Sequence, residues 1–95
     1  MTAWTFLTNH AQVLLCIARN QHITAREIAS MVGITERAVQ RIVADLEEAD
    51  YISHFRDGRQ NRYEIHRDRP MRHPAQRGYV IEDLLALLLP ADQSK

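Results

Sequence analysis

The chain has 95 residues, 12 Lys and Arg against 12 Asp and Glu, and 45% hydrophobic residues. This length fits one small domain, and the composition is that of a globular protein, neither disordered nor fibrous. Its one cysteine, Cys16, excludes a disulfide within the chain and favours a reducing compartment such as the cytoplasm. No basic-then-apolar segment opens the sequence, and the longest apolar run, 84–89, is far shorter than the roughly 20 residues of a membrane span, so we expect neither a secretory signal nor a membrane partner.

The zero net charge conceals an uneven distribution. Residues 1–50 carry four arginines against six acids, a net of −2; residues 51–77 carry seven arginines against three acids, a net of +4; residues 78–95 carry one lysine against three acids, a net of −2. Arginine presents a planar fork of donors that suits phosphate and guanine. A general preference for arginine over lysine would explain the residue type but not the clustering.

Two helices are expected in the first third of the chain. Thr8-Asn9 offers an N-cap for a helix that ends near Asn20, and its apolar residues cover more than one face. Such a helix is either deeply buried or shared with a partner. The stretch 24–27, Thr-Ala-Arg-Glu, has the spacing of a capping box and predicts the start of a second helix. Ile23, just before it, is a candidate for a short third strand beside the hairpin described below.

A third helix is predicted from Glu36 to about Ala49, after a turn at Gly33 and a cap at Thr35. At about 100° per residue, one side of it is apolar (Val39, Ile42, Val43, Leu46) and the other carries Arg37, Gln40, Arg41 and Ala44. Two helices joined by so short a turn have the spacing of a helix-turn-helix, whose second helix enters a DNA major groove about 12 Å wide.

The rest of the sequence, from residue 51 on, predicts a β-hairpin, a connector and a last helix. Strands at 51–55 and 62–65 flank Asp57–Asn61, whose Asp-Gly pair is a turn signal. Residues 67–77 predict an irregular connector, and 79–89 a short apolar helix that Pro90 ends. This helix either closes the core of one chain or forms a dimer interface; because its apolar residues occupy more than one face, we favour the interface, with Trp4 and Phe6 as possible members.

At these residues a resemblance to a known family is found. The stretch Ile23–Ile65, above all ITERAVQRIVADLEEA and DGRQNRY, resembles the winged helix-turn-helix of bacterial and archaeal transcription regulators of the MarR and ArsR type. It is also similar to short stand-alone regulators with an Arg-His-Pro connector, here Arg72–Pro74, before an apolar C-terminal helix. The resemblance implies a DNA-binding homodimer that controls transcription. Asp50 stands where such families usually have a left-handed glycine, and the paired cysteines of ArsR-type sensors are absent.

The resemblance assigns the site residues by position. In the recognition helix, the groove-facing residues would be Thr35, Glu36, Arg37, Gln40 and Arg41. In the wing, the DNA contacts would be Arg56, Arg59, Gln60 and Arg62. Arg67, Arg69 and Arg72 belong either to a solvated linker or to the DNA-facing surface.

We therefore expect a single domain of the α+β class over 1–95, mainly α with a small β-hairpin: a winged helix-turn-helix with a C-terminal dimerisation helix. The arm is 1–7, the winged core 8–66 with its wing at about 51–66, the connector 67–77 and the dimerisation helix 78–90. The expected dimer interface consists of Leu14, Ile17, Val80, Ile81, Leu84, Leu85 and Leu88.

The expected partners are double-stranded DNA and a second copy of the chain, with no cofactor. The five histidines show no metal-ligand spacing, and no Walker loop, nucleophile elbow or paired carboxylates indicate catalysis, so we expect neither a metal site nor an enzyme. The alternative from another class is a winged-helix module that binds proteins and not DNA. It would keep the apolar pattern but would not need a basic surface.

Overall fold

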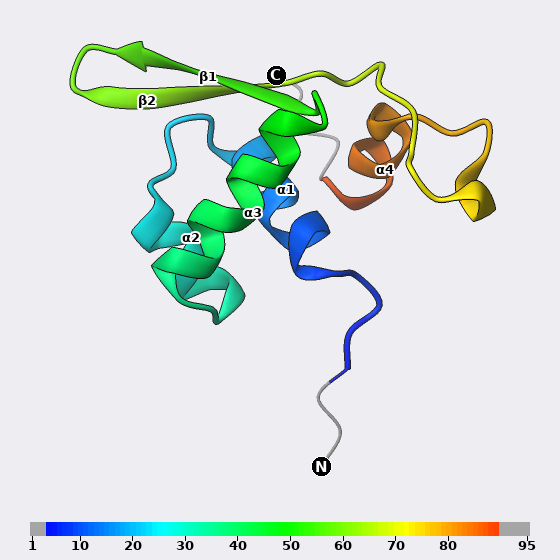
Figure 1. Cartoon of the computed structure of the whole chain (residues 1–95), viewed down its shortest axis with the longest axis horizontal. Coiled ribbons are helices and arrows are strands. Elements are labelled where there is room, and N and C mark those ends of the chain that lie inside the picture. The colour runs from blue at the N-terminus through cyan, green and yellow to red at the C-terminus, as the bar shows by residue number, and fades with distance from the viewer. Residues whose placement is uncertain (1–3, 90–95) are drawn as a thin grey trace.

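The computed structural model describes residues 4–89. The elements are α1 (Asn9–Arg19), α2 (Ala25–Val32), α3 (Glu36–Glu48), β1 (Ile52–Asp57), β2 (Gln60–Ile65), a 3-10 turn η1 (Pro74–Gln76) and α4 (Ile81–Leu88). The first three helices pack together, the hairpin projects beyond them on one side, and α4 lies toward the other side (Figure 1). This is the predicted α+β winged helix with a C-terminal helix. Two predicted features extend outside the described residues: the arm at residues 1–3, and the end of the last helix at Pro90.

Each of the three N-terminal helices begins at the threonine that the sequence indicated. The hydroxyls of Thr8, Thr24 and Thr35 accept a hydrogen bond from the backbone N–H three residues later, at 3.0–3.2 Å. Glu27 completes the predicted capping box, because its carboxylate accepts from the backbone N–H of Thr24 at 2.9 Å. These caps satisfy donors that a helix start leaves free, and so fix where each helix begins.

The core is built around α1. Five consecutive residues of this helix, Val13–Ile17, are buried. Helices α2, α3 and α4 all contact α1, so its second apolar face is covered by the chain itself. Of the two alternatives for this helix, the structure shows the deeply buried one.

The chain leaves α3 through a left-handed residue, as the position of Asp50 implied. The φ of Asp50 is +69°, the one positive value among the described residues other than glycine. Its backbone oxygen lies 2.8 Å from Nδ1 of His66, and its carboxylate lies 3.2 Å from the same nitrogen and 3.7 Å from Nε of Arg69. Aspartate tolerates this conformation better than most residues, and its side-chain contacts hold it there.

Replacing Asp50 by valine is expected to lower the free energy of unfolding by about 1–3 kcal/mol, because a β-branched residue is strained at positive φ. Asp50→Asn is the matched control: it also removes the charge but keeps a residue suited to this conformation. Urea unfolding of both variants gives the comparison. Equal stability of the two would contradict a role for the backbone conformation.

The hairpin is longer and its turn tighter than predicted. Asp57 pairs with Gln60, so the expected five-residue loop is a two-residue turn, and Asp57, Gln60 and Asn61 belong to the strands. Gly58, with φ +66°, takes the first central position, where a type II′ turn requires glycine. The third strand proposed at Ile23 is not formed within the described chain, where the sheet has two strands. The segment before α2 makes one strand-like contact, from the Tyr63 N–H to the Gln21 oxygen at 2.9 Å.

The connector is irregular, as predicted, but its two ends are tied together. Pro70 and Val80 form an isolated antiparallel bridge. The Nδ1 atom of His73 accepts from the N–H of Ala75 at 2.9 Å and caps η1, whose first residue is Pro74, so the His-Pro pair of the Arg-His-Pro sequence forms the start of this turn.

The last helix begins two residues later than predicted. The backbone oxygen of Tyr79 accepts from the N–H of Met71 at 3.0 Å, and the N–H of Val80 donates to the Asp83 carboxylate at 2.9 Å. These contacts hold residues 79–80 extended, so α4 starts at Ile81.

Candidate nucleic-acid interface

The outer face of α3 presents the predicted polar residues to solvent. Val39 and Ile42 are buried beneath it, and Arg37, Gln40 and Arg41 are exposed on the opposite side. None of the ion pairs formed among residues 4–89 includes Arg37 or Arg41. Their guanidinium groups are therefore available to an external anion or base edge.

Two predicted members of this face also have a structural role. The hydroxyl of Thr35 caps α3, and the Glu36 carboxylate pairs with Nε of Arg26 on α2 at 3.3 Å. This pair, with side chains 87% exposed for Arg26 and 49% for Glu36, links the two helices of the helix-turn-helix at the surface. The three remaining residues, Arg37, Gln40 and Arg41, form the part of α3 that is free to contact a ligand.

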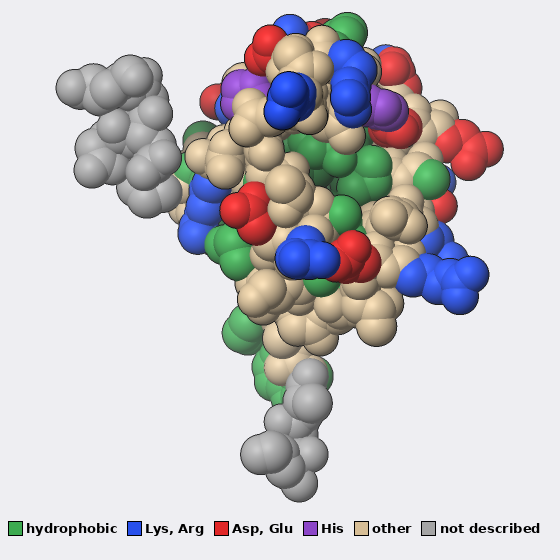
Figure 2. Space-filling model, turned by 90° about the vertical axis from the view of Figure 1, so that its left-hand side faces the viewer, with side chains coloured by type: hydrophobic (Ala, Val, Ile, Leu, Met, Phe, Trp, Pro, Cys, Tyr) green, Lys and Arg blue, Asp and Glu red, His purple; other side chains and the backbone are tan. Residues whose placement is uncertain are grey.

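The hairpin carries the second basic surface. Arg56, Arg59 and Gln60 are exposed, and the ion pairs of the described chain include neither of these arginines. Figure 2 looks onto the end of the hairpin and shows Lys or Arg and His side chains gathered around it. Arg62 differs: it is half-buried, its guanidinium lies 5.2 Å from the ring centroid of Phe55, and it is 3.4 Å from the Glu64 carboxylate.

The connector arginines differ in whether they form ion pairs, which the sequence analysis did not predict. Arg67 pairs with Glu82 on α4 at 2.8 Å, and Arg69 lies 3.7 Å from the carboxylate of Asp50. Arg72 is exposed without such a pair in the described residues. The first two arginines therefore tie the connector to the fold. The exposed arginines outside the ion pairs of the described chain are Arg37 and Arg41 on α3, Arg56 and Arg59 on the hairpin, and Arg19, Arg72 and Arg77 elsewhere.

Four of the five histidines bond to carboxylates from other parts of the chain. Because the partners are 7–35 residues away for three of these pairs, no local spacing in the sequence signals them. The pairs are His10–Asp45, His22–Asp57, His54–Glu47 and His66–Asp50. They connect α1 to α3, the α1–α2 loop to the hairpin, β1 to α3, and the end of β2 to the end of α3. Within residues 4–89, no three His, Cys, Asp or Glu side chains are grouped to hold a metal ion.

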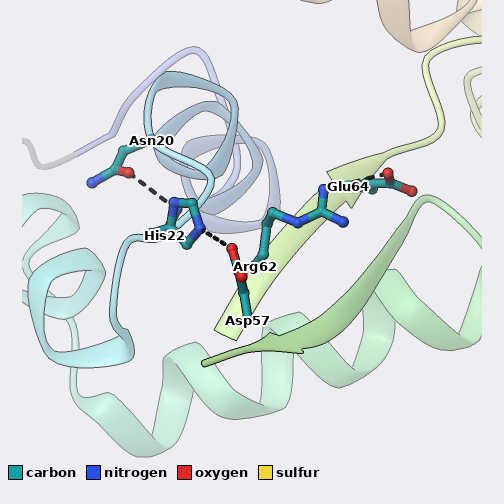
Figure 3. A network of polar contacts seen from close by, with 5 residues as sticks. All are labelled: Asn20, His22, Asp57, Arg62 and Glu64. Atoms are coloured by element: carbon teal, nitrogen blue, oxygen red, sulfur yellow. Dashed lines mark hydrogen bonds and ion pairs between the residues drawn. The ribbon is translucent and has the colours of Figure 1, made fainter. Parts of the chain in front are cut away.

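One of these pairs fixes the position of the hairpin (Figure 3). The Nε2 atom of His22, in the loop between α1 and α2, lies 2.9 Å from the Asp57 carboxylate at the end of β1. The Asn20 side chain accepts from the backbone N–H of His22 at 3.0 Å and orders this loop. Together with the Tyr63–Gln21 backbone bond, this contact holds the hairpin at two points and sets where its arginines lie relative to α3.

Replacing His22 by alanine is expected to loosen the hairpin without unfolding the domain. Because the two side chains are 36% and 55% exposed, such a pair contributes at most about 1 kcal/mol to stability. The amide of Tyr63, bonded to Gln21, should nevertheless exchange its hydrogen faster. His10→Ala, which removes a similar pair between α1 and α3, is the control and should leave that amide unchanged. Unchanged Tyr63 exchange in His22→Ala would contradict this role.

Two buried groups have shifted acidities. Burial raises the pKa of the Cys16 thiol, and the charge of Arg19 acts in the opposite direction. Burial, with a smaller contribution from Glu47, raises the pKa of Tyr63. Since the thiolate is the reactive form, Cys16 is a packing residue of α1 and not an activated nucleophile.

Comparison with known proteins agrees with this architecture. Residues 8–53, from the cap of α1 to the start of β1, match the family described as winged helix-turn-helix DNA-binding. An uncharacterized protein of Methanocaldococcus jannaschii is 33% identical over 60 residues, which cover 62% of this chain but 13% of that protein. No solved structure matches the chain. None of the helices in residues 4–89 has the length and hydropathy to cross a bilayer. The described chain thus has the fold of a winged helix, and residues 8–53 are similar to the winged helix-turn-helix DNA-binding family.

Proposed function

We propose that this protein is a sequence-specific regulator of transcription that binds double-stranded DNA as a homodimer in the cytoplasm. The observation that carries the proposal is the division of the arginines. Arg37 and Arg41 on α3, with Arg56 and Arg59 on the hairpin, are exposed and form no ion pair within the described residues, whereas Arg26, Arg67 and Arg69 are paired with the chain's own acids.

The chemistry of α3 suits the reading of base edges in the major groove. Arg37 and Arg41 can each donate two hydrogen bonds to guanine, and Gln40 can pair with adenine. Ala44, exposed one turn later, is small enough to let the helix approach the bases. The hairpin arginines would contact the backbone or the minor groove, which supplies affinity with little sequence preference.

A homodimer would place two copies of α3 in successive major grooves, about 34–36 Å apart, on a pseudo-palindromic site. The predicted interface needs revision, since Leu14, Ile17, Ile81 and Leu85 fill the core of the single chain. Val80 and Leu84 are half-buried, and Leu88 is 36% exposed. The proposal of a dimer therefore rests on these three residues and on further exposed apolar side chains of the same region.

Two arginine variants test the proposal. Arg59→Ala should weaken binding to all duplexes alike and lower the slope of log affinity against log salt by about one, because one phosphate contact is lost. Arg67→Ala is the matched control and should leave the slope unchanged, since that arginine is engaged by Glu82. Fluorescence anisotropy with a labelled random duplex gives both values. If the wild type does not bind the duplex at low salt, the protein-binding module becomes the better account.

A further inference from the structure

The segment before α1 carries two aromatic side chains that the chain does not cover. Trp4 is 68% exposed and Phe6 is 91% exposed, and their rings contact each other edge to face at 5.0 Å between centroids. Leu7, by contrast, packs against the core. Aromatic side chains gain most when they are buried, so this exposed pair indicates a contact that one chain alone does not make. We call residues 4–7 the aromatic arm.

An apolar groove lies at the base of α4. One part, of about 320 Å³, is lined by residues of α1, the connector and α4, including Leu14, Met71 and Leu84. A second part, of about 300 Å³, shares Met71 and Leu84 and adds Tyr79 and Leu87. Tyr79 is 60% exposed and Leu87 78% exposed, so the surface is open to a ligand. We call the two parts together the α4 groove.

The aromatic arm begins at the edge of the α4 groove, because Thr8 lines it, but residues 4–7 leave the body of the helices and line neither part of the groove. Leu7 is anchored on the core and Thr8 caps α1, which fixes the direction in which the chain leaves the helix. Figure 1 shows the segment before α1 leaving the body of the helices, and Figure 2 shows hydrophobic side chains along it, beyond the main surface. Each chain therefore has an unfilled apolar groove and an unburied aromatic arm.

We propose that a second copy of this chain docks by placing its aromatic arm in the α4 groove, and that the exchange is reciprocal about a two-fold axis. This inference rests on the homodimer of the proposed function and specifies how the two copies meet. Such an isologous contact uses the same two surfaces on both subunits and therefore closes as a dimer. Because α4 and the projecting hairpin lie on different sides of the helices, the hairpin stays accessible in the dimer (Figure 1).

The amount of surface agrees with a stable contact. Each arm contributes two aromatic side chains of about 150–250 Å², so the dimer would bury four. Together with the groove surface that they cover, they approach the roughly 1,200–2,000 Å² of a specific interface. The exposed leucines of α4, Leu87 and Leu88, would add to it. The arm thus supplies the apolar area that the small set of exposed α4 residues lacks.

The intrinsic fluorescence of Trp4 tests this directly, because it is the one tryptophan of the chain. In the dimer, Trp4 should emit at short wavelength and resist quenching by iodide. On dilution its emission should shift to longer wavelength in step with the dissociation of the dimer, followed in parallel by sedimentation velocity. The measurement is made without DNA, so it does not depend on whether the chain binds DNA.

A pair of charge-introducing variants locates the contact. Leu87→Glu, in the groove, should raise the dissociation constant of the dimer by at least about 10-fold. Met31→Glu is the matched control: Met31 is 58% exposed on α2, apart from the groove, and the dissociation constant should stay as in the wild type. Both positions are exposed, so neither substitution should prevent folding.

Two results would overturn the inference. Short-wavelength emission that persists in the dissociated monomer would show that the arm folds onto its own chain. Long-wavelength emission at every concentration, even in a dimer, would show that the copies meet through another surface. If the chain dimerises through the arm but does not bind DNA, the proposed function is refuted and this inference stands. If the chain binds DNA while Trp4 is exposed at every concentration, this inference is refuted and the proposed function stands.

Discussion

Replacing Arg41 by alanine is expected to reduce discrimination at one base pair of the preferred duplex by about 1–3 kcal/mol, roughly 5- to 150-fold in relative affinity. The physical reason is that Arg41 lies on the exposed face of α3, where its planar guanidinium is free to make two hydrogen bonds to a guanine edge. A contact of this kind specifies sequence, whereas a phosphate contact only adds affinity. The loss should therefore be confined to duplexes that contain the contacted base pair.

A panel of single-base-pair changes in a selected duplex measures this effect. Arg59→Ala is the comparison, because it should lower the affinity for every member of the panel by a similar factor. If Arg41→Ala keeps the wild-type ranking and spread of affinities, the residue does not read a base, and the assignment of the α3 face is incorrect.

Replacing Leu85 by alanine is expected to lower the free energy of unfolding by about 2–5 kcal/mol, since removal of a fully buried leucine loses its burial and leaves a cavity. Leu85 was predicted at a dimer interface, but its side chain is fully buried in the single chain, where α4 packs against α1. For a small domain this loss is a large share of the total stability. We therefore expect Leu85→Ala to be partly unfolded at room temperature.

The control for this variant is Leu87→Ala on the same helix. Leu87 is 78% exposed, so within the single chain the substitution should change stability by no more than about 0.5 kcal/mol. Chemical denaturation followed by circular dichroism, at several low protein concentrations, separates the contribution of one chain from that of a dimer. A Leu85→Ala loss that disappears on dilution would assign this side chain to the interface after all.

The helix caps and the buried side of α3, which have local sequence signals, were predicted correctly. The caps at Thr8, Thr24 and Thr35 and the buried side of α3 follow from neighbours three or four residues apart, and the structure contains all of them. For each cap, the same short segment contains both the signal and the interaction that it predicts. The left-handed conformation of Asp50 followed instead from the resemblance, in which a left-handed glycine usually stands at this position.

Features that depend on distant parts of the chain were missed or only half predicted. The His22–Asp57 pair joins residues 35 positions apart, and the Arg67–Glu82 pair joins residues 15 apart. Summing charge by segment assigned a net of +4 to residues 51–77, but it could not show that Arg67 and Arg69 are engaged by acids elsewhere.

Four of the seven residues predicted at the dimer interface are buried in the single chain, for a related reason. Periodicity shows that α1 and α4 have more than one apolar face. It does not show whether the second face meets another helix of the same chain or a second copy. In the structure, Leu14 and Leu85 are buried in the core of the single chain, whereas the aromatic arm and the α4 groove are exposed.

Selection from a library of random duplexes with the full chain tests whether α3 and the hairpin bind DNA with sequence preference as a dimer. We expect retention of DNA at low salt and enrichment of an inverted repeat whose half-sites are about 10–10.5 base pairs apart, centre to centre. A library that stays unbound at low salt, or one that is bound but shows no enrichment after repeated rounds, would contradict this expectation.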